Sequence, residues 1–143
     1  MSLLCPDAFL SPLAIDEAVA RALAEDLGRA GDVTSIATIP EGTRGAAVMK
    51  AREAGVVAGL AVAEVVFRKL DPAVEITGHL RDGATVAAKT VLMTIAGDAR
   101  ALLSAERTAL NFVGHLSGIA SAAAEFVRLV AHTRARVAIP DRR

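Results

Sequence analysis

The chain has 143 residues, of which 53% are hydrophobic, with no Trp, no Tyr and four Phe. This is the size of one ordinary domain, large enough to bury an aliphatic core. The 16 basic residues balance 16 acidic ones, so the net charge gives no basis for non-specific binding to nucleic acid or to a membrane surface. No run approaches the roughly 18 consecutive apolar residues of a membrane-spanning helix.

A single cysteine, Cys5, lies near the N-terminus. It cannot form a disulfide within the chain, and this favours a reducing, cytoplasmic compartment. The N-terminus lacks the basic start and apolar stretch of a secretory signal.

The first predicted element is a helix over residues 12–27. Ser11 suits its N-cap, Pro12 its first position and Gly28 its C-cap. Apolar residues repeat every four positions along one face: Ile15, Val19, Leu23 and Leu27. Residues 29–42 are predicted to form a loop.

The following segment alternates short strands with helices. Strands are predicted at 45–51, 55–59, 74–80, 85–86 and 91–95, with a helix at 60–70. A third helix is predicted at 99–115, a break at Ser117-Gly118, a fourth helix at 119–133 and a last strand at 136–139. This order predicts an α+β fold with a helical tail that opens a second structural unit.

The third predicted helix carries polar groups in unusual places. Its helical wheel puts Glu106 within a broad apolar arc, whereas Arg107, Asn111 and His115 form a separate stripe at four-residue spacing. A buried charge needs a partner or a ligand. Arg107 could therefore bind a carboxylate or phosphate while Glu106 pairs with a cation. Alternatively, Arg107 could simply be solvated and Glu106 could lie at the edge of the apolar face. Asn111 and His115 could be structural or could contact the same ligand. His115 does not indicate a zinc site, because no second His or Cys lies at ligand spacing from it.

Acidic residues also gather after the first helix. Glu25 and Asp26 lie at its C-terminal end, where the helix dipole disfavours them, and Asp32 follows in the loop. We expect Asp26 or Asp32 to be held by a hydrogen bond or a cation, and we expect Asp32, Thr34 and Ser35 to cap the loop.

Several ordered motifs identify a family resemblance. They are Ala-Glu-Asp-Leu-Gly at 24–28, Gly-Asp-Val-Thr-Ser at 31–35, Ala-Arg-Glu-Ala-Gly-Val-Val-Ala-Gly at 51–59, Ala-Leu-Leu-Ser-Ala-Glu-Arg-Thr-Ala-Leu-Asn-Phe at 101–112 and Leu-Ser-Gly-Ile-Ala at 116–120. The chain resembles the N-terminal half of quinolinate phosphoribosyltransferases, and the resemblance extends beyond these motifs to about residues 15–138.

The resemblance implies the reaction of quinolinate with phosphoribosyl pyrophosphate, which gives nicotinate mononucleotide, carbon dioxide and pyrophosphate in NAD biosynthesis. It implies a hammerhead-like α/β sandwich domain over residues 1–116, followed at 117–143 by only the first helix and strand of an incomplete α/β barrel. It implies a homodimer or higher homo-oligomer in which Arg107 reaches the substrate carboxylates of the partner subunit. Glu106, Asn111 and His115 would support Arg107.

The same resemblance implies a Mg²⁺ cofactor whose ligands, like those of the phosphoribosyl donor, have no counterparts in this sequence. No catalytic residue is assigned within the chain, and the 143-residue polypeptide is expected to be inactive alone. Two alternatives stay open: a related phosphoribosyltransferase-like protein of molybdenum-transport operons, and a non-catalytic dimerisation module that uses the apolar face of the fourth helix.

Overall fold

The computed structural model describes residues 11–137 and confirms the α+β fold. Its elements in chain order are α1 (Pro12–Leu27), α2 (Val33–Thr38), β1 (Arg44–Lys50), β2 (Gly55–Val56), α3 (Leu60–Leu70), β3 (Glu75–Gly78), β4 (Thr85–Val86), β5 (Val91–Asp98) and α4 (Ala99–Val130). Within these residues, no helix combines the length and apolar character needed to cross a membrane. Cys5 and positions 138–139 of the predicted last strand lie outside the described residues, and residues 135–137 form no strand.

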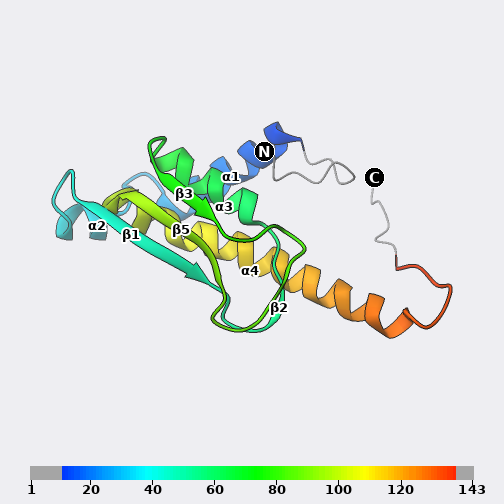
Figure 1. The fold of residues 1–143 in the computed structure, drawn as a ribbon. Helices are drawn as coiled ribbons and strands as arrows, with labels where there is room; N and C mark the ends of the chain where they lie inside the picture. Colours follow the sequence, from blue (N-terminus) through cyan, green and yellow to red (C-terminus); the bar gives the residue numbers. More distant parts are fainter. Residues whose placement is uncertain (1–10, 138–143) are drawn as a thin grey trace.

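Two antiparallel sheets make up the β layer. One has the strand order β1-β5-β3, and the other pairs β2 with β4. In the larger sheet the central strand places Ile95 opposite both Ala47 on β1 and Ile76 on β3. Figure 1 shows α1, α3 and α4 together behind this sheet. The helices and the sheet enclose one apolar core.

The boundaries of α1 and α3 agree with the sequence. Helix α1 begins at Pro12 and ends before Gly28, whose positive φ of 56° is one that glycine adopts readily. The predicted helix over residues 60–70 matches α3 at both ends. Its last turn carries Arg68 and Lys69, as the helix dipole favours.

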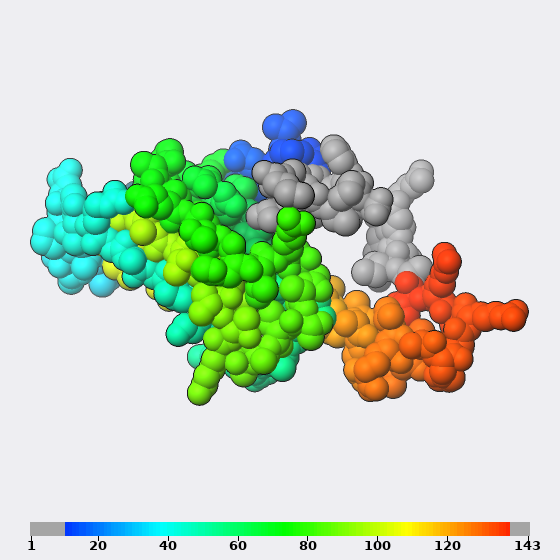
Figure 2. Space-filling view, in the orientation of Figure 1, coloured from blue at the N-terminus to red at the C-terminus, as the bar shows by residue number. Residues whose placement is uncertain are grey.

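The predicted break at Ser117-Gly118 is wrong, because α4 runs for 32 residues without interruption. Interior glycine costs a helix roughly 1 kcal/mol relative to alanine. Here the surrounding turns gain contacts with another segment that offset this cost. Beyond these contacts, the C-terminal part of α4 extends away from the body of the domain (Figures 1 and 2).

Two serines of α4, one turn apart, bond to the backbone around β2. The amide of Val56 donates to Ser121 Oγ at 2.8 Å, and the amide of Ala58 donates to Ser117 Oγ at 2.9 Å. The Ser117 hydroxyl in turn donates to the Ala58 carbonyl at 3.1 Å. A Cβ atom at Gly55 would lie only 2.6 Å from Ser121 Oγ. A side chain at position 55 would therefore displace the Ser121 hydroxyl from its hydrogen bond.

A loop was predicted at 29–42, but residues Val33–Thr38 form α2. The expected capping role of Asp32 is confirmed, since its Oδ1 accepts from the Ser35 amide at 3.0 Å and its Oδ2 from the Ser35 hydroxyl at 2.5 Å. Ser104 on α4 also donates to Oδ2, at 3.2 Å. At the other end of α2, Arg100 donates to the carbonyls of Ile36 and Ile39. Both ends of this short helix are thus attached to α4.

Replacing Gly55 should test how closely β2 approaches α4. We expect Gly55→Ala to cost about 1 kcal/mol or more of unfolding free energy, because Ser121 must give up its hydrogen bond to make room. In a Ser121→Ala background the new methyl meets only a Cβ at 3.6 Å, an ordinary contact. The two substitutions together should therefore cost about 1 kcal/mol less than their sum, as measured by urea denaturation. Strict additivity would contradict this close approach.

Asp32 should make stability depend on pH. The Ser35 hydroxyl, then the Ser35 amide and the Ser104 hydroxyl, hold the pKa of Asp32 below its ordinary value of 3.8. A lowered folded-state pKa adds stability above the unfolded-state pKa and loses it as the pH falls towards the folded value. We therefore expect Asp32→Asn to be destabilising at pH 7, with the difference from wild type shrinking below about pH 4.

Urea unfolding of both proteins at several pH values between neutral and about pH 3 measures this difference. Ser35→Ala, which removes the main donor to the carboxylate, should weaken the same pH dependence. A difference between Asp32→Asn and wild type that is constant with pH would show that the charge of Asp32 does not stabilise the fold.

Candidate functional site

Arg107 stands on the outer side of α4, and its side chain is 77% exposed. Its Nη1 atom lies 3.4 Å from Oδ1 of Asp26, which belongs to the last turn of α1. The Asp26 side chain is only 21% exposed. The expectation that a cation or a hydrogen bond holds one of the acidic residues after the first helix is thus met at Asp26 as well as at Asp32.

A cavity of about 510 Å³, here called the Arg107 pocket, opens beside this ion pair. Its lining residues come from α1 and α4: Ala22, Glu25, Asp26, Arg107, Thr108, Asn111, Phe112 and His115. The structure therefore brings Arg107, Asn111 and His115 to one cavity, as their four-residue spacing predicts. Whether Asn111 and His115 touch a ligand there stays a prediction.

Glu106 lies elsewhere. The prediction that it sits on a buried face is wrong, since Glu106 is exposed, as are its neighbours Leu103 and Leu110 on α4. The buried face of this part of α4 is narrower than the predicted arc. It consists of Leu102, Ala105, Thr108, Ala109 and Val113.

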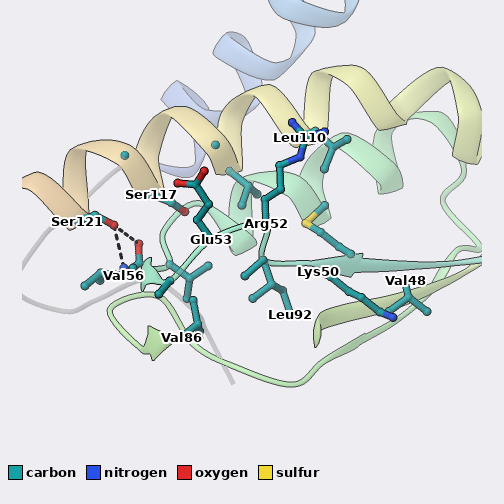
Figure 3. A pocket seen from close by; sticks show the side chains of 18 of the residues that line it. Val48, Lys50, Arg52, Glu53, Val56, Val86, Leu92, Leu110, Ser117 and Ser121 are labelled. Atoms are coloured by element: carbon teal, nitrogen blue, oxygen red, sulfur yellow. Dashed lines mark hydrogen bonds between the residues drawn. The ribbon is translucent and has the colours of Figure 1, made fainter. Parts of the chain in front are cut away.

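Glu106 instead lines a second cavity, of about 860 Å³, between α4 and the segment around β1 and β2. Figure 3 shows Arg52 and Glu53 extending towards α4 from the residues after β1, whereas Lys50 points away from the helix. Among the described residues Glu106 makes no ion pair. Glu106 and Arg107 are adjacent in sequence, but they therefore line two different cavities.

No contact was predicted for Thr108, Ser117 or Ser121, and Ser117 was predicted to be part of a helix break. Thr108 is 3% exposed, and its hydroxyl donates to Oδ2 of Asp26 at 3.5 Å. Small hydroxyl residues within an apolar helix do not by themselves predict a function, because such residues can be buried in a core or can form hydrogen bonds with another segment. Their roles depend on which segment packs against α4.

The chemistry of the Arg107 pocket is that of binding. A guanidinium has several N–H donors in a planar fork that matches a carboxylate or a phosphate. Among the described residues the Arg107 guanidinium pairs with Asp26 alone, so N–H donors remain for a ligand. Within residues 11–137 no group of three or more His, Cys, Asp or Glu side chains could hold a metal ion.

Comparison with known proteins gives a consistent result. A family model described as the quinolinate phosphoribosyl transferase N-terminal domain matches residues 32–117. The nicotinate-nucleotide pyrophosphorylase (carboxylating) of Mycobacterium leprae is 40% identical over 126 residues, which cover 85% of this chain and 43% of that protein. A quinolinate phosphoribosyltransferase (decarboxylating) of Nicotiana glauca, named as mitochondrial, is 39% identical over 107 residues, 75% of this chain and 30% of that protein.

The fold agrees with these relatives. The crystal structure of NadC from Streptococcus pyogenes superposes with a TM-score of 0.80 at 36% sequence identity, covering 85% of this chain and 44% of that one. The chain thus spans less than half the length of each of these relatives. The family model covers more than half of the chain, including Arg107, and the resemblance seen in the motifs is confirmed. The chain belongs to the quinolinate phosphoribosyltransferase family, of which it carries the N-terminal domain.

Proposed function

We propose that this chain provides the N-terminal domain of an enzyme that converts quinolinate and phosphoribosyl pyrophosphate to nicotinate mononucleotide, carbon dioxide and pyrophosphate. One observation carries the proposal: Arg107, inside the matched region, presents a guanidinium that is 77% exposed beside a cavity of about 510 Å³. Quinolinate carries two carboxylates, which are the groups that such a fork binds best. The names of the relatives favour quinolinate over the molybdenum-operon alternative.

The rest of the proposed active site lies outside these residues. Phosphoribosyl transfer depends on positioned cations around pyrophosphate. The Arg107 pocket offers one guanidinium against the carboxylates of Glu25 and Asp26. We therefore propose that the part of a full-length family member that lies beyond these residues supplies the sites for Mg²⁺ and for the phosphoribosyl donor. We also propose that the 143-residue chain alone does not turn over quinolinate.

A homo-oligomer in the cytoplasm is also part of the proposal. Beyond the body of the domain, α4 carries exposed apolar side chains: Ile119 (49% exposed), Phe126 (61%), Val127 (53%) and Leu129 (53%). Several exposed apolar side chains on one helical segment are typical of surfaces that another polypeptide covers. We propose that a second copy of the protein contributes to covering it, which a measurement of mass in solution tests.

Arg107→Lys should separate quinolinate binding from the rest of the reaction. The complete enzyme is here a protein that joins these residues to the remaining part of a full-length family member. We expect its wild-type form to produce nicotinate mononucleotide. The variant keeps the charge but loses the planar fork, and charge-assisted hydrogen bonds are worth about 1.5–3 kcal/mol. We therefore expect kcat/KM for quinolinate to fall roughly 10- to 100-fold, with the KM for phosphoribosyl pyrophosphate unchanged.

Arg44→Lys is a matched control. Arg44 is also an exposed arginine in a single ion pair, with Glu75 on the sheet, at 3.0 Å. We expect this variant to keep the wild-type kinetics. An unchanged KM for quinolinate in Arg107→Lys would remove Arg107 from the site, and a complete enzyme without quinolinate turnover would contradict the proposed function.

A further inference from the structure

Asp26 occupies a position that its own helix disfavours. It lies in the last turn of α1, where the negative end of the helix dipole opposes a carboxylate, and no basic residue of that turn compensates for it. A carboxylate placed there needs stabilisation from another element. Because α4 passes alongside, the stabilisation comes from two consecutive residues of that helix.

Both oxygens of Asp26 meet α4. Oδ1 lies 3.4 Å from Nη1 of Arg107, and Oδ2 accepts the Thr108 hydroxyl at 3.5 Å. Thr108 is buried, so the carboxylate is held against a fixed point of the helix. The 21% exposure of Asp26, against 77% for Arg107, makes the carboxylate the anchored partner and the guanidinium the exposed one.

The contact restrains Arg107 without using up its donors. Arginine has a long, flexible side chain, and fixing it upon ligand binding costs conformational entropy. An anchor beside Nη1 lowers this cost in advance, and no hydrogen bond to a described residue occupies Nε or Nη2. These two atoms are the edge of the fork that can bind a carboxylate with two parallel hydrogen bonds.

From this geometry we propose that Asp26 is a positioning residue: it orients the Arg107 guanidinium towards a carboxylate of the pyridine dicarboxylate substrate. The proposal rests on the proposed function of the same site. Asp26 itself does not touch the substrate. Positioning predicts that loss of the Asp26 charge weakens the binding of quinolinate. If Asp26 instead competed with the substrate carboxylate for Arg107, loss of its charge would strengthen that binding.

Asp26→Asn keeps the shape of the side chain and removes its charge. In the complete enzyme we expect the KM for quinolinate to rise about two- to fivefold, the range that an exposed ion pair can supply, while kcat and the KM for phosphoribosyl pyrophosphate stay unchanged. In an Arg107→Ala background the same substitution should have no further effect, because Asp26 acts through Arg107. Asp26→Glu, which restores the charge, should recover part of the affinity.

Glu25→Gln is the matched comparison. Glu25 lines the same pocket and makes no ion pair with a described residue. Its replacement removes the same charge from the pocket and leaves the Asp26–Arg107 pair intact, so we expect it not to raise the KM for quinolinate. A similar rise in both variants would show that pocket charge alone is responsible. A fall in the KM of Asp26→Asn would show competition instead of positioning.

A second measurement on the 143-residue chain is independent of activity. Side-chain ¹⁵N NMR of Arg107 reports how freely its guanidinium rotates. We expect this rotation to be faster in Asp26→Asn than in wild type and unchanged in Glu25→Gln. Equal mobility in all three proteins would overturn the positioning role even if the enzyme uses quinolinate. If Asp26 restrains the rotation of the Arg107 guanidinium but the enzyme does not use quinolinate, the proposed function is wrong while the Asp26–Arg107 ion pair is confirmed.

Discussion

The burial of one face of α4 is the constraint on which the rest of the domain depends. Five residues of this face are buried, and the helix contacts α1, α2, α3 and the sheet. Ala105 and Ala109 on α4 and Ala63 on α3 are all fully buried. Side chains this small let helices approach closely, so larger residues at these positions would push α4 outwards. Arg107 lies between Ala105 and Ala109, and its direction is therefore set by core packing.

Polar contacts then fix segments that the core alone would leave loose. Ser104 and Arg100 hold the two ends of α2, and Ser117 and Ser121 hold the backbone beside β2. Elsewhere carboxylates bind backbone amides at element ends: Asp82 accepts from the amides of Gly59 and Leu60 at the start of α3. Asp26 differs from these caps, because its partners are the side chains of Arg107 and Thr108. It joins the end of α1 to the exposed side of α4.

Local patterns predicted the elements whose boundaries are determined locally. Pro12 and Gly28 delimit α1, and the four-residue repeat gave its buried side. A break was predicted at Ser117-Gly118 because both residues usually weaken a helix. The prediction was wrong because Ser117 contacts Ala58, which lies 59 positions away in the sequence and gives no local signal. Glu106 was misplaced for a similar reason: a helical wheel gives relative directions, but the segments that pack against α4 determine how wide its buried face is.

The charges of the Arg107 pocket limit how the proposed site can bind a dicarboxylate. Glu25 and Asp26 place two carboxylates beside the one guanidinium of Arg107, and Asp26 already neutralises part of its charge. A dianionic pyridine dicarboxylate that entered this pocket alone would meet as much repulsion as attraction. Asp26 can serve as an anchor for Arg107 only if additional cations share the substrate's charge. On the proposed function, the ion pair within this chain therefore requires further positive charge on the opposite side of the site.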